Sequence, residues 1–229
     1  MTAAASAVPA SAVILLRSAE SAGFEVFFTR GSGGAYRFPG GTVSREDCEP
    51  RLLQRCCGLT PEEARRILGA QLKPALAIGH WVAAARYLFE QTGFLLAAGE
   101  DSGDWTPEGL SAKQASSIQG SFSFEAFLKD NRLICDLGRL LYFSRWQTGP
   151  DGGARHDKRF FVVALPGGQK PVARDEAAEA LWRAPDRALQ LFTHQQLPIG
   201  FATYTTVRTL ADFETIESVM KEYGRKRLE

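Results

Sequence analysis

The chain has no large excess of charge of either sign. Its 229 residues carry 27 lysines and arginines against 26 acidic residues, and the formal net charge is +1. A net charge so near zero gives no overall field that would attract nucleic acid or an anionic membrane. We therefore expect neither as a partner, and an anionic ligand has to be met by local charges.

Cysteine and histidine are also scarce. The four cysteines contain no C-x-x-C spacing, and the adjacent Cys56 and Cys57 make a poor disulfide framework. The histidines His80, His156 and His194 lie far apart in the sequence and form no local zinc motif. A reduced, cytoplasmic setting is the expectation.

Long hydrophobic runs are absent as well. The apolar run at residues 12–16 is too short for a membrane span or for the core of a signal peptide. Hydrophobic residues make up 45% of the chain and charged residues 23%, which is ordinary globular composition. Without a repeat or a clear linker, the chain is expected to form one domain over residues 1–229.

Local patterns predict several elements. Residues 12–17 and 24–30 indicate a β-hairpin. Thr60, Pro61 and Glu63 predict a capped helix to about residue 68. A second, longer helix is expected over residues 75–92, ended by Gly93.

The second half is less regular. We expect helical pieces at residues 122–129, 131–137 and 186–192, paired strands at 140–146 and 159–165, a helical or irregular segment at 175–181, and a terminal helix at 205–221.

One set of motifs combines a glycine-rich turn, a later acid and a distant helix. Its parts lie in order at Phe38-Pro39-Gly40-Gly41, at Asp47, and at Arg86-x-x-x-Glu90-x-x-Gly93-Phe94. The set resembles the Nudix box, whose family pattern is G-x5-E-x7-R-E-U-x-E-E-x-G-U, where U is an aliphatic or bulky apolar residue. Tyr87 stands at the glutamate of R-E, and Gln91 stands at the second glutamate of E-E, so the box is degenerate.

The spacing departs from that pattern too, because 44 residues separate Gly41 from Arg86. A branch of the Nudix superfamily that includes the peroxisomal coenzyme A diphosphatase carries an insertion at this place. The chain is similar to that branch in further segments, at Arg145-Trp146, at His156-Asp157-Lys158-Arg159-Phe160-Phe161 and at Trp182-x-x-Pro185-x-x-Ala188-Leu189.

The resemblance implies an α+β fold, the Nudix-type α/β/α sandwich with a mixed β-sheet and helical insertions. The insertions are expected at about residues 50–79 and 99–138. The ends of the first insertion must lie close together, because Gly41 has to meet Arg86 and Glu90. The insertion residues expected to be buried are Leu52, Leu53, Ile67 and Leu68.

Diphosphate hydrolysis of the Nudix type uses a hard cation, Mg2+ or Mn2+, which takes oxygen ligands. The resemblance assigns metal binding to Glu90, Gly40, Gln91 and Asp47, with Glu46 as an alternative to Asp47. Only one carboxylate remains on the helix, and an amide oxygen is a weaker ligand. Metal affinity is therefore expected to be reduced.

The remaining site predictions concern catalysis and substrate binding. The candidates are, for catalysis, Glu90, Arg86 and Glu176 and, for substrate binding, Gly41, Arg37 and Arg159. Glu176 is favoured over Glu179 as an acid from a later loop. The charged run His156-Asp157-Lys158-Arg159 could hold a phosphate or a loop acid. Plainer interpretations stay open, because Arg86 and Glu90 could form a surface pair, Glu176 could lie on a solvated helix face, and Arg159 could lie in a charged edge strand.

Two functions follow from these observations. The first is a metal-dependent hydrolase that cleaves a diphosphate linkage in a nucleoside diphosphate derivative, with coenzyme A or its esters favoured by the resemblance. The second is a catalytically defective Nudix domain that binds a nucleotide-like ligand or a protein, which Tyr87 and Gln91 favour. The expected partner is a small diphosphate compound, and a homodimer is an open alternative.

Overall fold

The computed structural model describes residues 7–19, 23–31, 33–99, 123–147, 155–167 and 180–225. The strands are β1 (Val8–Ser18), β2 (Phe24–Arg30), β3 (Tyr36–Arg37), β4 (Gly40–Thr42), β5 (Cys56–Cys57), β6 (Ala97–Gly99), β7 (Leu133–Asp136), β8 (Leu141–Gln147), β9 (His156–Ala164) and β10 (Ala180–Arg183). The helices in these residues are α1 (Pro50–Leu53), α2 (Pro61–Leu68), α3 (Pro74–Thr92), α5 (Phe124–Asp130), α6 (Pro185–Thr193), α7 (Phe201–Leu210) and α8 (Ile216–Arg225), with 3-10 turns at Glu46–Cys48 and Leu137–Arg139.

A mixed sheet forms the centre of the molecule. Its strands follow the order β10-β2-β1-β9-β8, while β3 pairs with β2 and β4 pairs with β1. Strands β1 and β2 form the predicted antiparallel hairpin, and β8 and β9 form the predicted second pair. Strand β1 runs parallel to β9, with Ser11 beside Arg159, and antiparallel to β4, with Ser11 beside Gly41. The glycine strand β4 therefore lies two strands away from β9.

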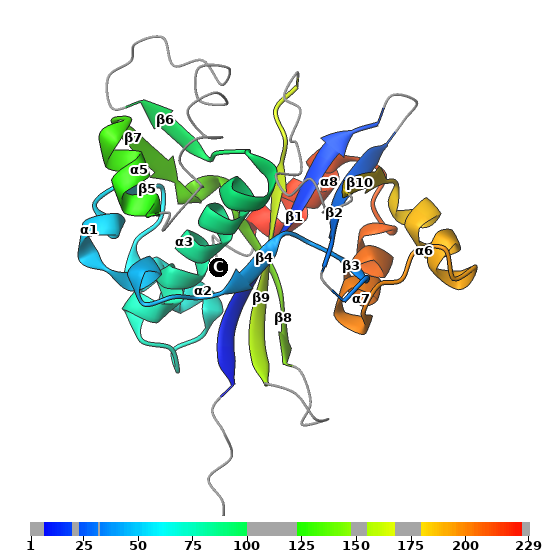
Figure 1. The fold of residues 1–229 in the computed structure, drawn as a ribbon, viewed down its shortest axis with the longest axis horizontal. Coiled ribbons are helices and arrows are strands. Elements are labelled where there is room, and N and C mark those ends of the chain that lie inside the picture. Colours follow the sequence, from blue (N-terminus) through cyan, green and yellow to red (C-terminus); the bar gives the residue numbers. More distant parts are fainter. Residues whose placement is uncertain are drawn as a thin grey trace, which may run out of the picture.

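Helices cover both faces of this sheet. Successive side chains of a strand point to opposite faces, and Val13 and Leu15 of β1 join a core cluster with α2, α3 and α5, whereas Ile14 and Leu16 join another with α6, α7 and α8. Figure 1 shows α1, α2, α3 and α5 on one side of the sheet and α6 and α7 on the other. The predicted α/β/α sandwich with a mixed sheet is confirmed.

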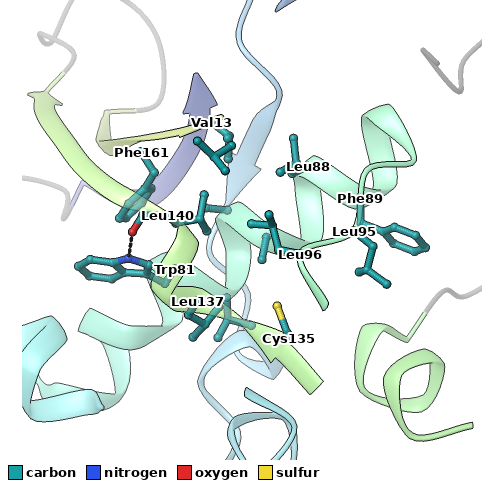
Figure 2. Close-up of a cluster of buried hydrophobic side chains, with 14 of the residues drawn as sticks. Val13, Trp81, Leu88, Phe89, Leu95, Leu96, Cys135, Leu137, Leu140 and Phe161 are labelled. Atoms are coloured by element: carbon teal, nitrogen blue, oxygen red, sulfur yellow. Dashed lines mark hydrogen bonds between the residues drawn. The ribbon is translucent and has the colours of Figure 1, made fainter. Parts of the chain in front are cut away.

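Helix α3 is the central element of the first core cluster. It begins with Pro74 at its first position and ends at Gly93, whose φ of 71° is left-handed, as predicted. Trp81 is buried and donates a hydrogen bond from Nε1 to the carbonyl oxygen of Leu140 at 3.1 Å, and Leu88 faces the same cluster (Figure 2). This packing fixes the helix against the sheet, so the side chains of its last turns are held in place.

The segment at residues 50–73 folds back onto α3. Helix α2 begins at the predicted capping box. Leu52 and Leu68 are buried in the same cluster as α3, and Leu53 and Ile67 pack against it. Strand β5 joins β7 and β6 in a second, three-stranded sheet. These residues therefore enlarge the core on the α3 side, while residues 74–79 of the expected insertion belong to α3 itself.

Two predictions for the second half were wrong. Residues 131–137 are not helical, because Leu133–Asp136 forms strand β7, in which alternate side chains are buried and Cys135 pairs with Ala97. Residues 180–181 begin strand β10 against β2, and the rest of that predicted segment, at 175–179, lies outside the described residues.

The predicted terminal helix at residues 205–221 is also wrong as a single element. It is two helices, because the chain turns after Leu210 and helix α8 starts anew at Ile216. The Ser218 N–H donates to the Thr215 hydroxyl at 3.2 Å, which caps the new helix. None of the described helices has both the length and the apolar character that crossing a membrane requires.

Candidate functional site

Gly40 and Gly41 allow strand β4 to lie between β1 and helix α3. A Cβ atom at Gly40 would collide with the backbone of Ser11 and Ala12, and one at Gly41 would collide with the ring of Tyr87. A residue without a side chain is required at Gly40, where the collision is with backbone atoms, and at Gly41 as long as Tyr87 keeps its place. The structure thus brings the predicted loop onto the predicted helix.

Gln91 joins this strand to the helix through two hydrogen bonds. The Gly40 N–H donates to Gln91 Oε1 at 3.0 Å, and Gln91 Nε2 donates to the Gly40 carbonyl oxygen at 3.1 Å. One side-chain amide therefore satisfies both backbone groups of one residue. We call this pair of bonds the Gln91 clasp.

Arg86 holds the segment that follows β4. Its Nε donates to Asp47 Oδ1 at 2.7 Å and its Nη2 to Asp47 Oδ2 at 2.8 Å, while Nη1 lies 3.2 Å from Glu90 Oε1. Asp47 is fully buried, and its Oδ2 also accepts a hydrogen bond from the Ser44 N–H at 2.8 Å. Burial acts to lower the pKa of Arg86, but Asp47 and Glu90 outweigh it and raise that pKa. The ion pair therefore stays charged and braces the loop.

Tyr87 occupies the place where the box pattern has a glutamate. Its ring lies against Gly41, and the guanidinium carbon of Arg86 is 4.1 Å from the ring centroid. This stacking is a cation–π contact. A phenol is a poor ligand for a hard cation at neutral pH, so Tyr87 fills the position with an apolar ring.

The described residues do not suit a hard divalent cation at this place. Gly40 and Gln91 use their polar atoms on each other, and both oxygens of Asp47 bind Arg86. Glu90, whose side chain is 24% exposed, pairs with Arg86 as well. No group of three or more histidine, cysteine or acidic side chains able to hold a metal ion occurs in the described ranges.

Asp47 was predicted to bind the metal, and the structure places its carboxylate in the interior, where it pairs with Arg86. The predicted catalytic Glu176 lies outside the described residues, as does its alternative Glu179. Glu90, Arg86, Gly40, Gly41 and Gln91 do lie together, at the junction of β4 and α3.

The opposite face of the same sheet carries a second group of side chains, which we call the Lys158 cluster: Lys158, Trp146, Ser144 and Phe201. Lys158 pairs with Trp146 in the register of β9 and β8, and Ser144 pairs with Phe160. The Trp146 ring meets Phe201 edge-on, with centroids 5.5 Å apart, and Phe201 is 70% exposed. An aromatic surface therefore lies beside a lysine.

Two polar groups of this cluster lack a hydrogen-bond or ion-pair partner among the described residues, although Lys158 Nζ lies 6.0 Å from the centroid of the Phe160 ring. The buried Ser144 hydroxyl has no hydrogen-bond partner, and no carboxylate in the described ranges pairs with Lys158. Burial and the positive charge of Arg37 both lower the pKa of Lys158. A half-buried ammonium group without a counter-ion is unfavourable, and a bound anion would relieve this strain on the charged form.

Arg37 and Arg159, both predicted to bind substrate, lie in different surroundings. Arg37 is exposed on β3. Arg159 is fully buried and pairs with Asp157, which Arg145 Nε also binds at 2.7 Å. Burial acts to raise the pKa of Asp157, but the two arginines outweigh it and lower that pKa. Direct contact between Arg159 and a ligand at the surface does not fit this full burial.

Sequence reasoning named Lys158 only as one member of a charged run that could hold a phosphate, and it missed Ser144. The available signal was alternation along β9, since Lys158 and Phe160 share one face of a strand while Arg159 and Phe161 share the other. The charged run at residues 156–159 does not show which of its members meets a counter-ion from elsewhere, because Arg145 reaches Asp157 and Arg159 only through the pairing of β8 with β9.

No model of a known protein family matches the chain, and no curated protein sequence matches it. Among solved structures, the chain is similar to a NUDIX hydrolase from Alicyclobacillus acidocaldarius, with a TM-score of 0.74 and 23% identity over 96% of this chain and 97% of that one.

Looser likenesses link the chain to two other solved structures. One is an Ap4A hydrolase of C. elegans in a binary complex, with a TM-score of 0.46 and 12% identity over 90% of this chain and 99% of that one. The other is the NUDIX domain of Shewanella oneidensis NrtR complexed with ADP ribose, with a TM-score of 0.46 and 10% identity over 90% and 88%. The layered sheet, the glycine strand on α3 and the likeness to the Alicyclobacillus structure together show that the chain has the Nudix fold.

Proposed function

We propose that the protein binds a small ligand in which an aromatic base is joined to a diphosphate, as in nucleoside diphosphate derivatives, at the Lys158 cluster. The observation that supports this most is Lys158 itself, a half-buried cation with a lowered pKa and no carboxylate partner in the described ranges. A phosphate oxygen would supply the missing acceptor through a charge-assisted hydrogen bond.

The neighbours of Lys158 suit the rest of such a ligand. Trp146 and the exposed Phe201 offer ring faces and edges to a base. Across the sheet, Lys158 is beside Ala10, which is beside Thr42 of the glycine strand. Two strand spacings amount to about 10 Å, so one nucleotide could extend from the aromatic rings to the edge of β4.

Binding is favoured over hydrolysis by the junction of β4 and α3. The oxygen donors expected to hold Mg2+ or Mn2+ are engaged with protein groups there, and one helix carboxylate remains. Of the two functions, we therefore favour ligand binding by a Nudix-fold protein over hydrolysis.

The test is calorimetric titration with ADP, ADP-ribose, coenzyme A, NADH and dinucleoside polyphosphates, with adenosine for comparison. Lys158→Met should weaken binding of the diphosphates about tenfold and change adenosine binding much less. Lys129→Met, at an exposed position of α5, is the matched control and should bind as wild type does. Equal affinity of wild type and Lys158→Met for every diphosphate, or no binding at all, would contradict the proposal.

Hydrolysis of the same class of ligand is the second candidate function. It is favoured by the partly exposed Glu90 beside the glycine strand, and the resemblance of the chain directs attention to coenzyme A and its esters. Phosphate or nucleotide release in the presence of Mg2+ or Mn2+ tests it. Glu90→Gln, which keeps the hydrogen bonding to Arg86, should then abolish turnover and leave the melting temperature nearly unchanged.

A further inference from the structure

The Gln91 clasp uses one donor and one acceptor of a single side chain. The Gly40 N–H needs an acceptor and the Gly40 carbonyl needs a donor, and the two bonds of 3.0 and 3.1 Å supply both. An amide carries both kinds of atom, whereas an ionised carboxylate carries acceptors only. Glutamate at this position could satisfy the N–H but would set a negative charge beside the carbonyl oxygen.

We infer that Gln91 replaces a divalent cation as the link between the glycine strand and helix α3. A carbonyl oxygen and a carboxylate side by side need a positive charge between them, and a bound cation would provide it. The amide hydrogens of Gln91 provide the positive partner within the chain itself. In this protein the strand is fastened to the helix without metal.

The groups around the clasp agree with this inference. Tyr87 packs its ring on Gly41, in the space beside the clasp, and stacks on Arg86 at 4.1 Å. Glu90 and Asp47 both pair with Arg86. The two carboxylates nearest the clasp, those of Asp47 and Glu90, thus both have a protein partner without a metal ion.

The first measurement uses the wild-type protein without any ligand. Its melting temperature should be the same in EDTA, in Mg2+ and in Mn2+, and calorimetry or the EPR signal of Mn2+ should detect no bound ion. A clear rise of the melting temperature with either cation, or stoichiometric Mn2+ binding, would overturn the inference. Because no ligand is present, failure of the proposed ligand binding at Lys158 leaves this result unaffected.

The second measurement uses Gln91→Glu. In EDTA this variant should melt about 3–6 °C lower than wild type, because it loses the donor to Gly40 and gains a repulsion. Gln196→Glu, the same exchange at an exposed position, is the control and should melt with wild type. Equal melting temperatures of Gln91→Glu and wild type in EDTA would show that the Gln91 clasp does not stabilise the fold.

The third measurement asks whether a cation can take over the place of the amide. Addition of Mn2+ should restore part of the lost melting temperature in Gln91→Glu, and the double variant Tyr87→Glu with Gln91→Glu should bind Mn2+ where wild type does not. A folded double variant that binds no Mn2+ would overturn the claim that amide and cation are alternatives at one place.

Discussion

Two places on one sheet treat their charged groups in opposite ways. At the junction of β4 and α3, Arg86, Asp47 and Glu90 form close ion pairs of 2.7–3.2 Å, and the Gln91 clasp satisfies Gly40. At the Lys158 cluster on the other face, the ammonium group and a buried hydroxyl have no polar partner in the described ranges. The first arrangement stabilises the fold, whereas the second leaves polar groups without the partners that would offset the cost of their burial.

Burial alone does not separate these two cases. Asp47 is more deeply buried than Lys158, yet its carboxylate is fully engaged by Arg86 and Ser44. A buried polar group is ordinarily paired, so an unpaired one indicates a functional place more strongly than a low exposed fraction does. Pairing therefore favours a structural role for the junction, and the unpaired groups are the reason that we propose ligand binding at the Lys158 cluster.

The largest effect on stability is expected from a substitution that breaks the ion pairs at the junction of β4 and α3. Asp47→Asn leaves the guanidinium of Arg86, whose side chain is 14% exposed, without its main counter-charge. The free energy of unfolding, from urea denaturation, should fall by about 3 kcal/mol. Asp212→Asn is the matched control, because its pair with Arg208 has side chains 64% and 58% exposed, and it should change stability by less than about 1 kcal/mol. Equal effects of the two variants would remove the contrast.

The pH dependence of the free energy of unfolding gives a second test of a buried polar group that has a partner, in this case His80. Burial, with the nearby charge of Arg159, lowers the pKa of His80 to about 4, and its Nδ1 lies 3.0 Å from the Ser11 hydroxyl. Between the unfolded pKa of 6.5 and 4, the unfolded chain binds the proton and the folded protein does not. Stability contributed by neutral His80 is therefore present above pH 6.5 and is lost as the pH falls toward 4, by about 3 kcal/mol in all.

His80→Gln provides the check on that titration. Its free energy of unfolding should depend less on pH between 6.5 and 4 than that of wild type. His194→Gln, at an exposed position after α6, should keep the wild-type dependence. A loss of stability of the same size in all three proteins would assign the acid sensitivity to other groups.

Much of the fold was predictable where local chemistry is strong. The capping box of α2 and the left-handed Gly93 after α3 both act within one turn of chain. The helix predicted at residues 131–137 is wrong because the strand there, Leu133–Asp136, is short. Its pairing with β6 depends on residues far away in the sequence. The break before α8 depends on Thr215 and was hidden by a continuous apolar pattern.

The candidate site was predictable as a set of positions but not as a set of contacts. The placement of Gly41 in one cluster with Arg86 and Glu90 follows from the resemblance to the box, despite the long insertion between them. The partner of Asp47 and the burial of Arg159 could not be read from the chain, because each depends on which side chain faces it across the core. Lys158 is distinguished from the rest of its charged run only in the structure, where no carboxylate of the described ranges pairs with it.

The smallest expected effect is also the one that decides the comparison. Lys158→Met removes a half-buried charge that has no carboxylate partner in the described ranges, so the ligand-free variant should be as stable as wild type or more stable, by up to about 1 kcal/mol. Because the pKa of Lys158 is lowered, wild type should approach the variant as the pH rises toward 10.5, where the folded protein releases the proton first. Thermal unfolding between pH 7 and 10, with Lys129→Met as control, measures both differences. A marked loss of stability in Lys158→Met at pH 7 would mean that Lys158 stabilises the fold as Arg86 does, and the distinction between the two places would fail.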